Sequence, residues 1–124
     1  MASEWVGGVL DQHELDLGRT VFVGFSQGSA LAFLLAERQS MCPAAVVSLA
    51  GYLPGGDLAQ LNGLPVFWGH GSQDQTIPVS RARLDVQRLE DLGAEVRYCE
   101  AEVGHKVGVE CMRGLKGWLH QSIG

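Results

Sequence analysis

Short apolar runs alternate along this chain with longer segments of helical periodicity. Three runs bounded by glycine or proline predict strands covered on both faces, at residues 20–24 (TVFVG), 45–49 (AVVSL) and 65–69 (PVFWG). A fourth run, at residues 95–99 (EVRYC), alternates polar and apolar positions, which predicts a half-exposed edge strand.

The segments between these runs predict helices. Residues 29–39 are apolar on every side as far as Glu37, so we expect a deeply buried helix there. Residues 79–92 predict an amphipathic helix that begins after Pro78 and ends before Gly93. Further helices are predicted near the two ends of the chain. The apolar faces of these amphipathic helices are formed by Trp5, Val6, Val9 and Leu10, by Ala82, Val86 and Leu89, and by Cys111, Leu115 and Trp118.

This alternation of strands and helices predicts an α/β fold with about four parallel strands flanked by helices. The chain has 124 residues, which fits a single domain over residues 1–124. In parallel sheets of this kind, ligands bind beyond the carboxyl ends of the strands. We therefore look for chemistry in the segments that follow each strand.

Composition and charge exclude several classes of protein. Apolar residues make up 46% of the chain and charged residues 19%, which excludes a disordered or collagen-like chain. The net charge is -5 and no basic run occurs, which argues against a nucleic-acid partner. No apolar run approaches the roughly 20 residues of a membrane span.

The chain has three cysteines, Cys42, Cys99 and Cys111. Their number is odd, and no two are spaced as a CxxC pair. We therefore expect three free thiols that are buried as small apolar groups, no zinc site and a reducing, cytoplasmic setting.

Residues 24–28 (GFSQG) match the pattern GxSxG between a predicted strand and a predicted helix. In that context Ser26 occupies a nucleophile elbow, a strained turn that exposes the hydroxyl group. A larger residue two positions to either side of Ser26 is expected to collide with the backbone. The first amides of the following helix point to where an oxyanion would form. The alternative is a glycine-rich turn in which Ser26 only caps the helix.

Two more residues stand beyond predicted strands. Asp74 follows the third strand and His105 follows the fourth. Because parallel strands bring their carboxyl ends to one rim, Ser26, Asp74 and His105 can meet there as nucleophile, orienting acid and base. Taken singly, Asp74 also suits a turn and His105 a surface loop.

The remaining histidines are less informative. His13 and His120 lie in polar stretches and are expected to be solvated, whereas His70 could support Asp74, face the pocket or pack in the interior. Tyr52, Leu53 and Trp68 lie near strand ends, where they could either line an acyl pocket or pack in the core. The expected substrate contacts are Phe25, Tyr52, Leu53 and Ile77.

Three motifs together resemble the phospholipase/carboxylesterase family of α/β hydrolases, which includes the acyl-protein thioesterases. They are GFSQG, then HGSQDQTIPV, then VGHKVGVE ahead of a helix that contains GWL. The resemblance runs from about Leu15 to the last helix. It implies Ser26 as nucleophile, His105 as general base, Asp74 as its partner and the backbone N–H of Gln27 as an oxyanion donor.

The chain departs from this family in one respect. Family members have several strands before the elbow, and an early loop that supplies a second oxyanion N–H. This chain shows no counterpart of either. We therefore expect a truncated or minimal α/β hydrolase, either a fragment or a natural miniature.

The resulting prediction is a serine carboxylesterase that hydrolyses short-chain acyl esters through an acyl-enzyme, without metal or cofactor. The alternative is an inactive hydrolase remnant that acts as an interaction module. If the strands lie in sequence order, the strand from Thr20 to Gly24 forms an apolar edge, which predicts a homodimer or higher homo-oligomer through that edge. A strand order that begins in the centre of the sheet would remove this edge.

Overall fold

The computed structural model of the chain describes residues 20–38 and 42–122. Its four strands are all parallel and lie in one sheet in sequence order, which confirms the predicted fold. The predicted helix around Trp5 and Val9 lies outside the described residues. The elements are β1 (Val21–Phe25), α2 (Gln27–Glu37), β2 (Ala45–Leu49), the short 3₁₀ helix η3 (Ala59–Leu61), β3 (Pro65–Gly71), α3 (Val79–Asp91), β4 (Glu95–Ala101) and α4 (Val109–Ser122).

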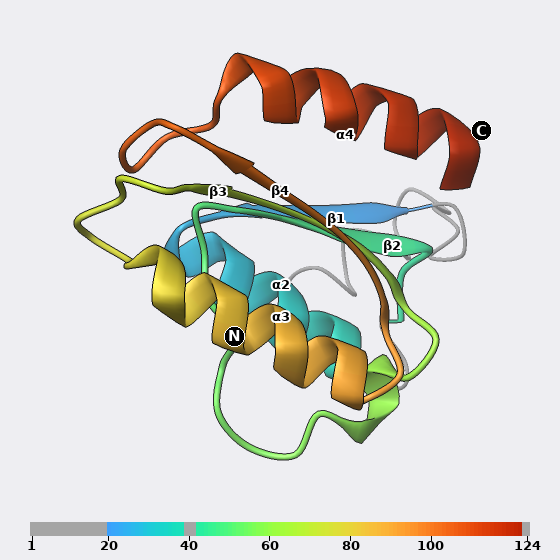
Figure 1. Ribbon diagram of the computed structural model, residues 1–124. Coiled ribbons are helices and arrows are strands. Elements are labelled where there is room, and N and C mark those ends of the chain that lie inside the picture. Colours follow the sequence, from blue (N-terminus) through green and yellow to red (C-terminus); the bar gives the residue numbers. More distant parts are fainter. Residues whose placement is uncertain (1–19, 39–41, 123–124) are drawn as a thin grey trace.

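The helices cover both faces of the sheet (Figure 1). α2 and α3 lie side by side on one face, where Phe33, Trp68 and Leu89 belong to a cluster of buried side chains. α4 lies on the opposite face, where Trp118 packs against Phe67. The predicted apolar faces of α3 and α4 are therefore confirmed as the faces that pack on the sheet.

β1 is the edge strand of this sheet within the described residues, as the sequence-order prediction requires. The alternative, in which the first strand lies in the centre, is wrong. The side chains of Val23 and Phe25 are exposed to 63% and 47%. This edge is apolar and carries no charged residue on the strand itself.

α2 is less buried than predicted. Its inner side packs into the core through residues such as Phe33 and Ala36, but Leu31 and Leu34 are exposed to 44% and 47%. The prediction of a deeply buried helix is therefore wrong for one side of α2. The physical reason is that no described strand lies beyond β1 to cover that side.

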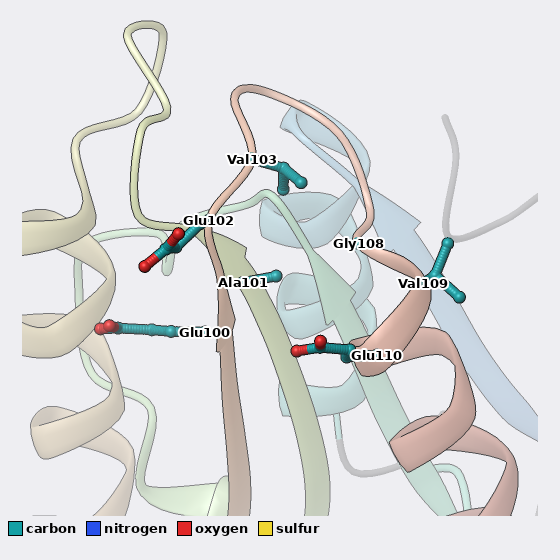
Figure 2. Close-up of a pocket in the computed structure, with 7 residues that line it drawn as sticks. All are labelled: Glu100, Ala101, Glu102, Val103, Gly108, Val109 and Glu110. Atoms are coloured by element: carbon teal, nitrogen blue, oxygen red, sulfur yellow. The ribbon is translucent and has the colours of Figure 1, made fainter.

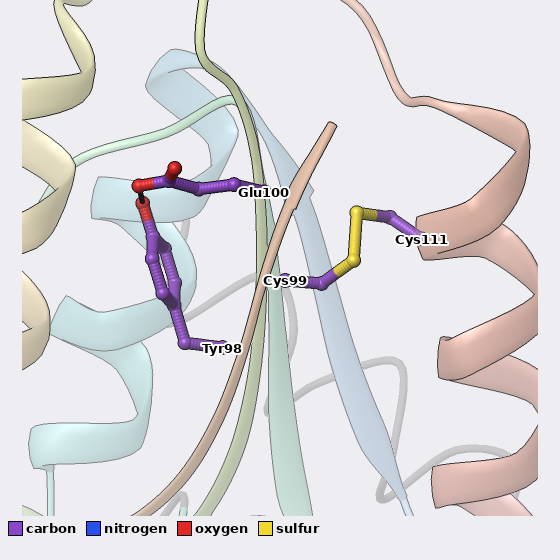
Figure 3. Close-up of a disulfide and its surroundings, with 4 residues drawn as sticks. All are labelled: Tyr98, Cys99, Glu100 and Cys111. Atoms are coloured by element: carbon purple, nitrogen blue, oxygen red, sulfur yellow. Dashed lines mark hydrogen bonds between the residues drawn. A yellow bond between two sulfur atoms is a disulfide. The ribbon is translucent and has the colours of Figure 1, made fainter. Parts of the chain in front are cut away.

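The cysteines also differ from the prediction. Cys99 of β4 and Cys111 of α4 form a disulfide (Figure 3). Only Cys42 is free among the described cysteines, and it is exposed and not buried as predicted. α4 folds back over β4, which brings these two residues together although no sequence motif pairs them. Because two of the three thiols are joined, the cysteines give no support for a reducing, cytoplasmic setting. Within the described part of the chain, no helix is long and apolar enough to cross a membrane.

Candidate active site

Ser26 lies in the turn between β1 and α2, in a strained backbone conformation with φ 57° and ψ -120°. Its amide donates a hydrogen bond to the carbonyl of Leu49 at 3.0 Å, which ties the turn to β2. A Cβ atom at Gly24 would overlap the backbone of Gly28, so this turn requires glycine at position 24. A Cβ at Gly28 would meet no described atom within 4 Å, so the predicted collision is confirmed only at Gly24.

The Ser26 hydroxyl does not cap the helix. The first turn of α2 receives no hydrogen bond from this side chain. Instead, Ser26 Oγ lies 3.0 Å from His105 Nε2. The helix-cap alternative is therefore wrong. Because an α-helix leaves its first amides without intrahelical acceptors, the N–H of Gln27 at the start of α2 can serve an external oxygen.

His105 lies in the loop between β4 and α4, and its Nδ1 is 2.7 Å from Oδ2 of Asp74. This loop reaches Asp74 because it packs closely on the end of β3. A Cβ at Gly71 would overlap the carbonyls of Val103 and Gly104, so only glycine allows this approach. The backbone after β3 also pairs with the loop, as the Gln73 amide donates to the Val103 carbonyl at 3.0 Å.

The carboxylate of Asp74 is buried and accepts three hydrogen bonds. The amides of Thr76 and Ile77 both donate to Oδ1 at 2.8 Å, and His105 contacts Oδ2. Burial by itself would raise the pKa of Asp74. The hydrogen bonds from Ile77, His105 and Thr76 outweigh burial, so the pKa of Asp74 is lowered from its ordinary value of 3.8. Asp74 is therefore ionised at neutral pH.

The four predicted substrate contacts divide into two groups. The ring of Phe25 is half-exposed and lies 5.2 Å from the ring of His105, measured between centroids. Tyr52 is partly exposed, with the Arg81 guanidinium 5.4 Å from its ring centroid. Leu53 and Ile77 are buried, with 0% and 8% exposure. Leu53 therefore offers no surface to a ligand, and the alternative of core packing describes it.

A cavity of about 620 Å³ lies at the junction of β4 and α4 (Figure 2). Its lining contains three carboxylates, from Glu100, Glu102 and Glu110. Figure 2 shows Glu100 and Glu102 on the strand and the loop after it, and Glu110 on the first turn of α4. None of Ser26, Asp74 and His105 lines this cavity, and its acidic lining differs from the apolar pocket that an acyl chain needs. Within residues 20–38 and 42–122, no three His, Cys, Asp or Glu side chains gather as a metal site would require.

One residue near the site was not found from the sequence. Asp85 of α3 is 2% exposed, and its Oδ2 accepts hydrogen bonds from the Leu53 amide at 2.9 Å and from Arg81 Nε at 2.8 Å. It thereby holds the segment after β2 that carries Tyr52. Its position was a usable indication, because residues 82, 85, 86 and 89 follow the helical spacing of a buried face.

The model of the phospholipase/carboxylesterase family matches residues 3–123. The chain belongs to this family. Solved structures with the same fold include a carboxylesterase from Bacillus cereus (22% identity, TM-score 0.87), which covers 98% of this chain and is itself covered to 58%. Esterase PE8 is similar at 23% identity and a TM-score of 0.88, again over 98% of this chain and 58% of its own length. Acyl-protein thioesterase 2 from Zea mays is similar at 22% identity and a TM-score of 0.69, over 82% of this chain and 55% of its own.

These structures define what the family resemblance covers. The chain corresponds to a part of the fold of these structures. It spans less than two thirds of the length of the esterases named above. At these identities the similarity establishes the α/β-hydrolase fold of the chain.

Proposed function

We propose that Ser26, His105 and Asp74 form the catalytic triad of a serine carboxylesterase that acts on short-chain acyl esters. The observation that carries the proposal is the continuous hydrogen-bond chain from Ser26 Oγ to His105 Nε2 at 3.0 Å, and from His105 Nδ1 to Asp74 Oδ2 at 2.7 Å. Membership of the phospholipase/carboxylesterase family supports it.

In the first half of the reaction, Ser26 Oγ attacks the carbonyl carbon of the ester, and His105 Nε2 takes the hydroxyl proton. Asp74 accepts the Nδ1–H of the same ring, which fixes the tautomer and stabilises the imidazolium that forms. The tetrahedral intermediate then expels the alcohol, which receives its proton from His105 Nε2. This leaves an acyl group on Ser26.

In the second half, His105 Nε2 takes a proton from a water molecule as its oxygen attacks the acyl carbon. The second intermediate releases the carboxylic acid, and the proton returns to Ser26 Oγ. No metal or cofactor takes part in these steps.

Among the described residues, the proposed oxyanion site has one donor, the N–H of Gln27. Removing one donor from such a site typically costs about 10²- to 10³-fold in kcat. We therefore expect slow turnover and a preference for activated esters such as aryl esters, whose leaving groups depart readily. A second donor from another chain or segment would raise the rate.

The substrate is expected to be small. Phe25, beside His105, and Tyr52, beyond the end of β2, are the exposed or partly exposed apolar surfaces among the proposed contacts. Leu53 and Ile77 are buried and add no wall to a longer pocket. Acyl chains of a few carbons fit this surface better than fatty acyl chains.

A fluorophosphonate probe tests the proposal, because it reacts only with an activated serine. Wild type should be labelled on Ser26, whereas Ser26→Ala should not be labelled. The matched control is Ser80→Ala, which removes an exposed serine of α3 and should leave labelling unchanged. An unlabelled wild type with native structure would favour the alternative, an inactive hydrolase remnant that acts as an interaction module.

We also propose that a second copy of the chain covers the β1 side and forms a homodimer. The edge of β1 and the exposed side chains of Val23, Leu31 and Leu34 offer apolar surface that monomers rarely leave in water. A two-fold contact between two β1 edges would extend the sheet and bring a neighbour's backbone close to Ser26. Light scattering should give twice the 13.3 kDa mass of the chain, whereas a stable monomer would contradict the homodimer.

A further inference from the structure

His70 is a buried polar residue that the proposed reaction does not use. It is the next-to-last residue of β3, four positions before Asp74, and only 2% of its surface is exposed. Its ring lies between the indole of Trp68 and the loop that carries Asp74. Burying an imidazole costs free energy unless both of its ring nitrogens have hydrogen-bond partners.

Both ring nitrogens of His70 have partners, and the partners select one tautomer. Nε2 lies 2.8 Å from the carbonyl oxygen of Ile77, which can only accept, so Nε2 carries the proton. Nδ1 lies 3.5 Å from Nε1 of Trp68, whose N–H can only donate, so Nδ1 is the acceptor. Trp68 is itself completely buried. The ring is therefore held in one orientation by donors and acceptors on both sides.

The partner of His70 is also the partner of Asp74. Ile77 accepts from His70 through its carbonyl and donates to Asp74 Oδ1 through its amide at 2.8 Å. The other oxygen of that carboxylate holds His105. His70 Nε2 is in addition 3.6 Å from Asp74 Oδ2. One residue thus contacts both the loop backbone and the carboxylate that orients the proposed base.

We propose that His70 is a positioning residue, which acts through Ile77 to hold Asp74 in the geometry that orients His105. The inference rests on the proposed function, because it assigns His70 a task in that same site. His70 does not touch the ester. A side chain that only filled space would need no donor toward Ile77. A positioning role requires a hydrogen-bond donor at the position of Nε2, whereas a packing role requires only a side chain of similar size.

A matched pair of substitutions tests this requirement. The amide of glutamine can place an N–H near the position of histidine Nε2, whereas the shorter asparagine reaches only the position of Nδ1. We expect His70→Gln to keep kcat within a few-fold of wild type and His70→Asn to lower it by about 10- to 100-fold, with little change in KM. Leu89→Ala is the control for lost stability, because it empties a buried site away from the triad and should leave kcat unchanged.

A spectroscopic readout tests the same inference without turnover. The His105 Nδ1–H that faces Asp74 should give a downfield proton resonance, which should persist in wild type and His70→Gln and weaken or shift in His70→Asn. Equal kcat values and resonances in folded His70→Gln and His70→Asn would overturn the inference, and so would equal losses in both. Failure of the proposed function would give a different result, namely that the fluorophosphonate probe does not label Ser26 in wild type. The resonance would then still show whether the His70 substitutions disturb the contact between His105 and Asp74.

Discussion

The two edge strands of the sheet, β1 and β4, differ in charge and in covalent links to the rest of the fold. β4 carries three charged residues, Glu95, Arg97 and Glu100. Glu100 forms hydrogen bonds with Arg83 at 2.6 and 3.0 Å and with the Tyr98 hydroxyl at 2.8 Å. A disulfide joins the same strand to α4 (Figure 3). β1 has no charged residue, and its side chains Val23 and Phe25 are exposed.

The two edges therefore have different roles: the β4 edge stabilises the fold, and the β1 edge is available for assembly with another chain. The β4 edge carries charges and a covalent bond, which both stabilise the fold and discourage pairing with another strand. The β1 edge carries apolar surface that gains free energy only when something covers it. The proposed triad bridges the two sides, since Ser26 follows β1 and His105 follows β4. Substitutions on the two sides should therefore have different effects on the free energy of unfolding and on assembly. Substitutions of triad residues should lower kcat on either side.

The largest expected effect is on catalysis. It should be equally large for a substitution after β1, at Ser26, and for one after β4, at His105. Ser26→Ala and His105→Ala should each lower kcat by about 10⁴- to 10⁶-fold, because triad members act as one unit. Asp74→Asn should cost the same or less, since it spoils the orientation of His105 but keeps the nucleophile. Hydrolysis of a p-nitrophenyl ester measures all three. Unchanged turnover by purified Ser26→Ala would show that the elbow is structural.

The second effect concerns the β4 side. The disulfide closes a loop between residues separated by 12 positions, so its removal should lower the free energy of unfolding by about 3 kcal/mol. Urea denaturation of a Cys99→Ala/Cys111→Ala variant measures the loss. Cys42→Ala is the control, because that thiol is free and exposed. Equal stability of the double variant and wild type would contradict a stabilising disulfide.

Acid should weaken the same side by a smaller amount. Hydrogen bonds from Arg83 outweigh burial and lower the pKa of Glu100, and the pKa of Asp74 is lowered as well. A carboxyl group whose pKa is lower in the folded state stabilises the fold fully above its unfolded value, which is near 4. That stabilisation is lost as the pH falls through the folded value. From these two carboxyl groups we therefore expect a constant contribution to the free energy of unfolding from pH 7 to about 5 and a declining contribution below about 4.

Glu100→Gln tests the part of this acid sensitivity that belongs to the β4 edge. The variant should be less stable than wild type at pH 7 and should approach it only as the pH falls through the lowered pKa of Glu100, below which both carry an uncharged group. An identical difference at both pH values would mean that the ionised carboxylate contributes nothing to stability.

The smallest effect on stability is expected on the β1 side. Leu34→Glu places a charge on the exposed side of α2 and should change the free energy of unfolding of the monomer by no more than about 0.5 kcal/mol. It should nevertheless dissociate the proposed homodimer, as measured by light scattering. Leu84→Glu is the matched control, because Leu84 is exposed to 67% on α3. If both variants dissociate the dimer, or if neither does, the dimer contact does not lie on the β1 side.

Local patterns in the sequence predicted the sheet well. Each strand begins within a residue or two of its predicted start, because apolar runs between glycines and prolines leave few other places for buried strands. The residues brought together at Ser26 were also predictable, since parallel topology sends the three loops to one rim. What failed depended on contacts between distant elements. The pairing of Cys99 with Cys111 requires α4 to fold back over β4, and the exposure of Leu34 depends on what lies beyond β1.

Strand order has a consequence for how the chain acquires its structure. Because each strand pairs with the one before it, the sheet can grow from β1 to β4 in the direction of synthesis. The contact between Ser26 and His105 spans 79 residues, so closing it costs more chain entropy than the neighbouring strand pairs do. A nascent chain would therefore form its elbow first and hold a serine without a base. In the proposed triad, Ser26 would gain its base only when the loop that carries His105 docks.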